Sequence, residues 1–147
     1  MSKTDTWENS LLLLLFNNTT MANVGDATGL RGTTTAGQLF LSLHTADPGE
    51  TGNQTTNEIS YTGYARVGLN RASGAGGFTV TANSVSPAGN VDFGACTAGS
   101  GTATHFGIGT ASTGTGILLY KGALSPTIAV STGVTPRINS TSTVTED

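Results

Sequence analysis

Hydrophobic and polar residues alternate over much of the chain after residue 37, a pattern that predicts strands burying one face. The clearest case is residues 38–45, where Leu39, Leu41 and Leu43 occupy every second position. Turn-forming residues separate this segment from other short runs of the same kind. We predict further strands at residues 61–69, 77–82, 90–94, 102–110, 116–124, 127–131 and 142–145.

The segment from residue 4 to 17 has helical spacing instead, with Asp5 available as the cap and Glu8 three residues later as its capping-box partner. Asn17 and Asn18 mark its end. Apolar side chains cover most of the helix circumference, so the helix needs cover on several sides. It either plugs the end of its own domain or docks on a neighbouring subunit. In the second case the interface residues are Trp7, Leu11, Leu12, Leu13, Leu15 and Phe16.

Between the helix and the first strand, residues 19–37 are polar and rich in glycine, with Gly25-Asp26 and Gly29 as turn signals. A segment of this length without its own periodicity predicts an extended arm that is mobile or lies against a partner. We therefore expect residues 1–37 to form a helix and arm, and residues 38–147 to form a β domain.

About eight short strands without intervening helices indicate an all-β sandwich or barrel. A jelly-roll-like antiparallel β-sandwich is the favoured architecture, and an immunoglobulin-like sandwich stays open. The composition agrees, because 21 glycines and only 10% charged residues suit many strands joined by tight turns. The single cysteine, Cys96, predicts a buried structural thiol.

Charge and hydropathy argue against several classes of partner. Six Lys and Arg residues are scattered along a chain of net charge −3, so we expect neither nucleic-acid binding nor a basic membrane patch. The apolar run from Leu11 to Phe16 is too short to span a bilayer and makes a poor signal peptide. These features predict an intracellular product.

The sequence also predicts no enzyme, no cofactor and no metal site. His44 and His105 fall within predicted strands without a nucleophile motif nearby, and His44 with Asp47 is too few ligands for a metal. His44 is expected to make ordinary hydrogen bonds at the edge of a sheet. Glu58 and Arg66 lie near tyrosines and are predicted to form a structural hydrogen-bonded pair.

Four segments carry a resemblance to a known family, at residues 41–50, 57–67, 101–109 and 116–124. After a Leu-rich helix, the first three contain "Leu-x-Thr-x-x-Pro" at residues 43–48, "Glu-x-x-x-x-x-Tyr-Ala-Arg" at residues 58–66 and "Thr-His-x-x-Ile" at residues 104–108. Together they resemble a family of small virion structural proteins of tailed bacteriophages. The resemblance covers most of the chain from Thr6 onward.

The resemblance implies a non-enzymatic virion protein that is assembled in the host cytoplasm. The favoured role is a capsid decoration, or cement, protein that binds the major capsid protein and copies of itself as a homo-oligomer and stabilises the head. One alternative is a tail or tail-fibre component. Another is a carbohydrate-binding jelly roll that exposes aromatic residues such as Tyr61, Tyr64 or Trp7.

Overall fold

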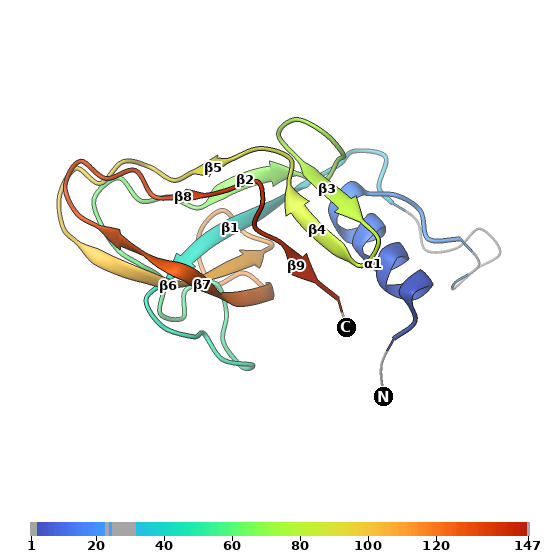
Figure 1. Ribbon diagram of the computed structural model, residues 1–147, viewed down its shortest axis with the longest axis horizontal. Helices are drawn as coiled ribbons and strands as arrows, with labels where there is room; N and C mark the ends of the chain where they lie inside the picture. Colours follow the sequence, from blue (N-terminus) through green and yellow to red (C-terminus); the bar gives the residue numbers. More distant parts are fainter. Residues whose placement is uncertain (1–2, 23, 25–31, 147) are drawn as a thin grey trace. The chain divides into compact units, whose positions relative to one another are not determined.

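The computed structural model describes residues 3–22, 24 and 32–146. It is mainly β with one N-terminal helix, which confirms the predicted all-β class (Figure 1). The elements are α1 (Asp5–Asn17), β1 (Gln38–His44), β2 (Val67–Asn70), β3 (Phe78–Thr81), β4 (Ser84–Pro87), β5 (Val91–Asp92), β6 (Gly101–Gly109), β7 (Leu118–Val130), β8 (Arg137–Ile138) and β9 (Val144–Thr145). The jelly-roll topology stays a prediction.

The chain divides into two compact units. The first contains residues 1–38, 69–90 and 139–147, and the second contains residues 39–68 and 91–138. Each unit is therefore built from segments that are distant in the sequence. The predicted division into residues 1–37 and 38–147 stays untested, and residues 25–31, which include Gly25-Asp26 and Gly29 of the expected arm, lie outside the described residues.

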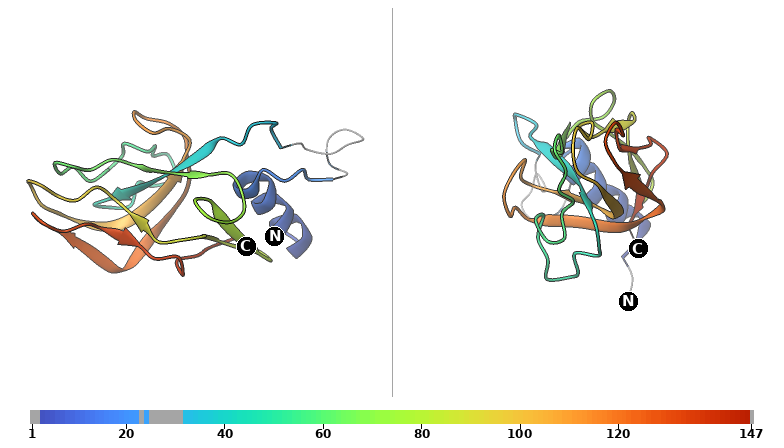
Figure 2. Two further views of the ribbon diagram at one scale, coloured as in Figure 1. Left: turned by 90° about the horizontal axis from the view of Figure 1, so that it is seen from above. Right: turned by 90° about the vertical axis from the view of Figure 1, so that its left-hand side faces the viewer.

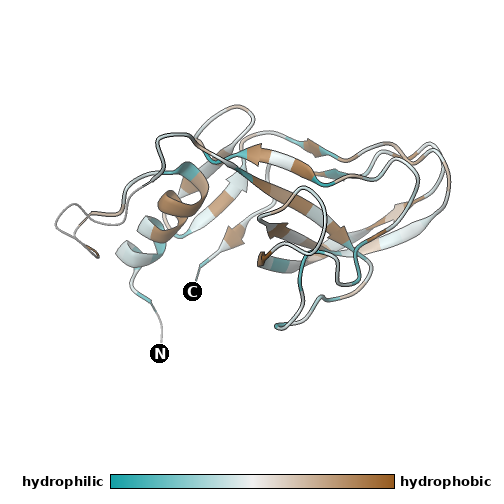
Figure 3. Ribbon diagram, turned by 180° about the vertical axis from the view of Figure 1, so that it is seen from behind, coloured by the Kyte–Doolittle hydropathy of each residue, from teal (hydrophilic) through white to brown (hydrophobic). Residues whose placement is uncertain are grey.

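In the first unit, α1 packs against the sheet β3-β4-β9. The N-cap lies one residue earlier than predicted, because Thr4 is the cap and Asp5 is already the first residue of the helix. The predicted capping box is therefore wrong. The helix ends as predicted, since Asn18 adopts a left-handed conformation and its N–H binds the Leu13 carbonyl. Figure 3 shows apolar residues concentrated in the later turns of α1.

The buried stripe of α1 is narrower than the apolar surface that covers most of the helix circumference. The helix buries residues spaced four apart, namely Glu8, Leu12 and Phe16. These lie on one face of a helix, and Phe16 meets Phe78 of β3. The choice among nearly equivalent apolar faces was decided by the sheet on which the helix packs.

The second unit contains the ribbon β5-β8 and most of the sheet with strand order β2-β1-β6-β7, of which Gln38 and residues 69–70 belong to the first unit. The strands β1 and β6 pair antiparallel, as do β6 and β7, and β6 and β7 lie side by side in both views of Figure 2. Leu39, Leu41 and Leu43 are buried as predicted. The other core residues of this unit include Ile59, Tyr61, Val91, Phe93, Cys96, Ala103, Ile108, Val130 and Ile138.

Three strand predictions need correction. The predicted strand at residues 61–69 is confined to β2, because Tyr64 N bonds to the Tyr61 carbonyl in a turn around Gly63. The two strands predicted at residues 116–124 and 127–131 form the single strand β7. The strands β4 and β8 were not predicted.

Candidate functional site

The interface residues predicted on α1 divide into a buried and an open group. Leu12 and Phe16 are fully buried, and the rings of Phe16 and Phe78 meet edge to face with centroids 4.9 Å apart. Trp7 is 38% exposed. The remaining members are half-buried: Leu11, Leu13 and Leu15. Leu12 and Phe16 thus stabilise the first unit, and Trp7 is the member best placed to meet a partner.

The C-terminal end of α1 is fixed by Arg71, which the sequence did not identify. Its Nε donates to the Leu15 carbonyl at 2.6 Å and its Nη2 to the Leu14 carbonyl at 2.8 Å. The last carbonyls of a helix have no partner within the helix, and a cation there also complements the helix dipole. No local sequence signal connects Arg71 to a helix so far along the chain.

Glu58 and Arg66, the predicted pair, meet in a two-pronged ion pair in the second unit. The Arg66 Nε and Nη2 atoms donate to the two Glu58 carboxylate oxygens, each at 2.7 Å. The side chains are only 3% and 16% exposed for Arg66 and Glu58. The hydrogen bond to Glu58 raises the pKa of Arg66 above its usual value, so its charge is constant.

Arg66 also holds the loop that joins β6 and β7. Its Nη1 donates to the Ala111 carbonyl at 2.9 Å and its Nη2 to the Gly114 carbonyl at 2.8 Å. Gln54, which is fully buried, binds the same loop through both ends of its side-chain amide. Its backbone N–H binds the Thr115 carbonyl at 2.9 Å. The loop is therefore held in one conformation, and nothing in the polar sequence around Gln54 indicated this role.

Tyr64 links the ion pair to the sheet. Its hydroxyl donates to Glu58 Oε1 at 2.8 Å and accepts the backbone N–H of Leu43 at 3.1 Å. Its ring stacks on Phe93 with centroids 6.2 Å apart. Burial raises the pKa of Tyr64, so the phenol stays protonated. Every polar group here has a structural partner, and the cluster Glu58, Tyr64 and Arg66 positions backbone rather than offering a reactive group.

His44 and Ser42 form a second polar pair, with 2.8 Å between Nε2 and Oγ. The Nδ1 atom lies 2.8 Å from the Thr56 carbonyl and must donate to it, since a carbonyl only accepts. Burial lowers the pKa of His44, which favours the neutral ring, so Nε2 accepts from the Ser42 hydroxyl. Both side chains are fully buried. A serine next to a histidine can suggest a nucleophile, but no substrate reaches this one.

The predicted position of His44 at a sheet edge is wrong. β1 lies between β2 and β6, where His44 pairs with His105 on one side, and Glu58 forms a bridge with His44. His105 is half-buried, and its Nδ1 lies 2.9 Å from the Thr104 hydroxyl. Among the described residues no three His, Cys, Asp or Glu side chains gather as metal ligands.

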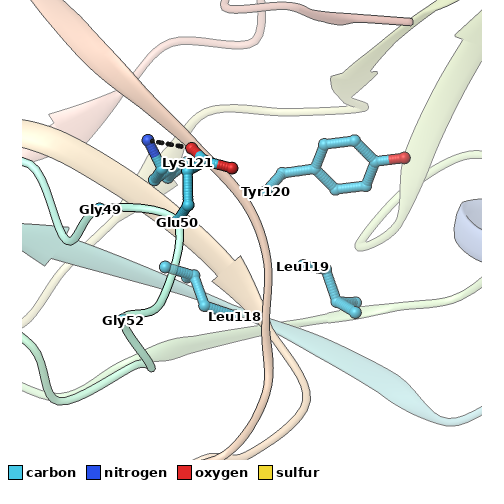
Figure 4. A pocket seen from close by; sticks show the side chains of 7 residues that line it. All are labelled: Gly49, Glu50, Gly52, Leu118, Leu119, Tyr120 and Lys121. Atoms are coloured by element: carbon cyan, nitrogen blue, oxygen red, sulfur yellow. Dashed lines mark ion pairs between the residues drawn. The ribbon is translucent and has the colours of Figure 1, made fainter.

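A surface pocket lies beside the start of β7 (Figure 4). Its lining residues are Gly49, Glu50, Gly52, Leu118, Leu119, Tyr120 and Lys121. The Lys121 Nζ lies 3.0 Å from both Asp47 Oδ1 and Glu50 Oε1. Hydrogen bonds that Lys121 donates to Glu50 and Asp47 raise the pKa of Lys121, and bonds from the Gly49 N–H and Lys121 lower the pKa of Asp47. The pocket thus has an internally balanced charge and presents no isolated ionic group to a ligand.

The structure also describes Cys96, Tyr61 and the helix that the sequence analysis considered. Cys96 is a buried free thiol, as predicted. Tyr61 is buried and donates to the Gly94 carbonyl, so the exposed tyrosine platform of a carbohydrate-binding module does not form from Tyr61 and Tyr64. In the described ranges no helix combines the length and apolar character that crossing a membrane requires.

Comparison with known proteins gives one family. The family model described as podophage GP4 fiber I protein gp80 matches residues 2–146. No curated protein matches the chain. The family match extends over both compact units and includes the helix α1 as well as the cluster Glu58, Tyr64 and Arg66.

Proposed function

Because the chain belongs to the podophage GP4 fiber I protein gp80 family and is a structural protein of the bacteriophage virion, we propose that it is a subunit of a tail fibre. The family match over residues 2–146 is the observation that carries this proposal. The subunit acts by contact with other virion proteins and catalyses no reaction. The core of a protein interface is depleted in charged residues, which agrees with the 10% charged residues of this chain.

The second unit has features that suit such a role. Arg66 and Gln54 hold the β6–β7 loop by bonds to its backbone. Ser112 and Thr113 in that loop are exposed, and Ile117 at its end is 65% exposed. A loop fixed in this way loses little conformational entropy when it binds a partner. The cluster around Arg66 therefore favours a contact role.

Capsid decoration is the second candidate function. In that case the chain binds the major capsid protein and copies of itself and stabilises the head, and the resemblance of residues 43–48, 58–66 and 104–108 to phage virion proteins supports it. The family description names a fibre, which favours the tail. The two candidates predict different positions on the particle.

Gold labelling of intact phage separates the two candidates. Cys96 is buried, so Thr132→Cys on an exposed turn gives a single reactive thiol in this chain. Phage carrying this substitution is treated with maleimide-linked gold and imaged by electron microscopy, and phage with the unchanged chain reports labelling of other virion proteins. We expect the additional gold on fibres at the tail. Additional gold distributed over the head would overturn the fibre proposal in favour of decoration.

A further inference from the structure

The strand β7 forms an open side of the second unit's sheet. The sheet order gives β7 one neighbour, β6, and among the described residues no strand lies on its other side (Figure 1). It is thirteen residues long, and Val130 is its one buried residue. The backbone groups along such an edge can pair with another strand.

The first half of β7 carries little of the protection that edge strands usually have, since its one irregularity in pairing with β6 lies at its start, between Leu118 and Tyr120. Charged residues, prolines and bulges normally prevent pairing with a second chain. Residues 118–124 contain one charged residue, Lys121, and Pro126 lies beyond them. The Lys121 charge is balanced by Asp47 and Glu50 of the same chain, each at 3.0 Å. The outer edge of this stretch therefore has no neighbouring strand among the described residues, and its one cation is paired within the chain.

We propose that residues 118–124 of β7 pair antiparallel with the same residues of a second copy, which joins two four-stranded sheets across a two-fold axis. A two-fold contact requires a surface that is complementary to itself, and an unpaired antiparallel edge meets this requirement. Like charges that face each other across two strands destabilise the pair. Asp47 and Glu50 offset the Lys121 charge, which reduces repulsion between the two lysines.

The features near β7 favour a second copy over another site on the same chain. β2, the other end strand of the sheet, is four residues long and cannot match seven residues of β7. Ile117, which directly precedes the stretch, is 65% exposed. Pairing of two β7 strands brings each Ile117 close to the new interface, where burial of its side chain adds to the association.

Cysteine cross-linking of the full-length protein tests the contact directly. Single cysteines are placed along the stretch as Leu119→Cys, Lys121→Cys and Ala123→Cys, with buried Cys96 left in place. In an antiparallel pair a residue near the two-fold axis faces its own copy, so mild oxidation should give disulfide-linked dimers at one of these positions. Thr132→Cys, exposed but outside β7, is the control. Equal cross-linking at Thr132→Cys, or none along β7, would overturn the proposal.

Introducing like charges into β7 gives a second test, and the same samples are checked for folding. The double variants Leu119→Lys/Ala123→Lys and Leu119→Glu/Ala123→Glu are studied by sedimentation over about a hundredfold range of concentration, with circular dichroism to verify the fold. Like charges should weaken self-association about tenfold or more in each variant. An equimolar mixture should restore dimers. The proposal fails if the unchanged protein is monomeric over this range, or if both variants associate as strongly as it does.

Discussion

The strands β1 and β7 belong to one sheet but are stabilised in different ways. From Leu41 to His44 every residue of β1 is buried, although Ser42 and His44 are polar. β7 is almost twice as long and buries only its last residue. Length therefore does not measure how firmly a strand is held in this protein.

The difference lies in where the polar groups find partners. His44 and Ser42 bond to each other, and the Thr56 carbonyl accepts the remaining ring N–H. The Tyr64 hydroxyl binds the backbone of β1 at Leu43. On β7, Lys121 pairs with exposed carboxylates at the surface. β1 is thus fixed by a buried polar network within the chain, whereas β7 has an outer edge with which a strand of another chain can pair.

The largest expected effect comes from truncating the same residue type in both strands. Leu43→Ala in β1 should lower the free energy of unfolding by about 2–5 kcal/mol, because it leaves a cavity in a fully buried site. Leu124→Ala in β7, where the leucine is half-buried, is the matched control and should cost about 1 kcal/mol. Urea denaturation measures both losses. Equal losses would contradict the contrast between the strands.

The next effect tests whether the β6–β7 loop depends on the buried network. Arg66→Lys keeps the charge but loses the two-pronged geometry and the bonds to Ala111 and Gly114, so stability should fall by about 2–3 kcal/mol. Arg137→Lys is the control, because Arg137 makes a similar but exposed pair with Asp92. Chemical denaturation of the two variants gives the comparison. A comparable loss for both variants would mean that burial of the Arg66 pair contributes nothing.

The alternation of leucines with other residues predicted β1 correctly, because these leucines all face the core on one side of the sheet. It could not predict that Ser42 and His44 are buried too, since that depends on Thr56 in a loop later in the chain. Two strands were predicted on either side of Pro126, at residues 116–124 and 127–131. The strand β7 continues through this proline because an edge strand does not need every N–H for pairing. β4 was missed because its turn is Ala82-Asn83, without glycine.

The candidate site was predictable where the chemistry was local. Glu58 and Arg66 lie in one short segment, and opposite charges beside tyrosines suggested their pairing. Gln54 and Arg71 bind backbone atoms far along the chain, and such contacts leave no pattern in the sequence. The helix α1 was predicted, but its buried face was not. Its apolar residues surround the axis, so the sequence allowed several different faces to be buried.

A smaller effect is expected from pH, through His44. Its pKa is lowered in the folded protein by burial, while Glu58 opposes this and Arg66 and His105 add to it. The folded state therefore binds fewer protons than the unfolded state below about pH 6.5. The contribution of His44 to stability is complete above that pH and is lost as the pH falls toward the lowered pKa of the folded state.

Unfolding measured between about pH 7.5 and 5.5 should show this loss, with a slope no steeper than about 1.4 kcal/mol per pH unit. His44→Gln retains a polar side chain and removes the titration, so its stability should change less over the same range. His105→Gln, at the half-buried residue that pairs with His44 across the strands, is the control. If His44→Gln keeps the full pH dependence, a group other than His44 causes it.

The smallest effect on folding should come from Lys121 on β7. Its ion pairs lie at the surface, so Lys121→Met should leave the free energy of unfolding within measurement error. It also leaves Asp47 and Glu50 without their cation beside the β7 edge, and self-association should weaken because two copies then bring together unbalanced carboxylates. Lys3→Met, which removes a lysine paired with Glu146 in the first unit, is the control. A loss of stability as large as that of Leu43→Ala would show that β7 is held as firmly as β1 and is no open edge.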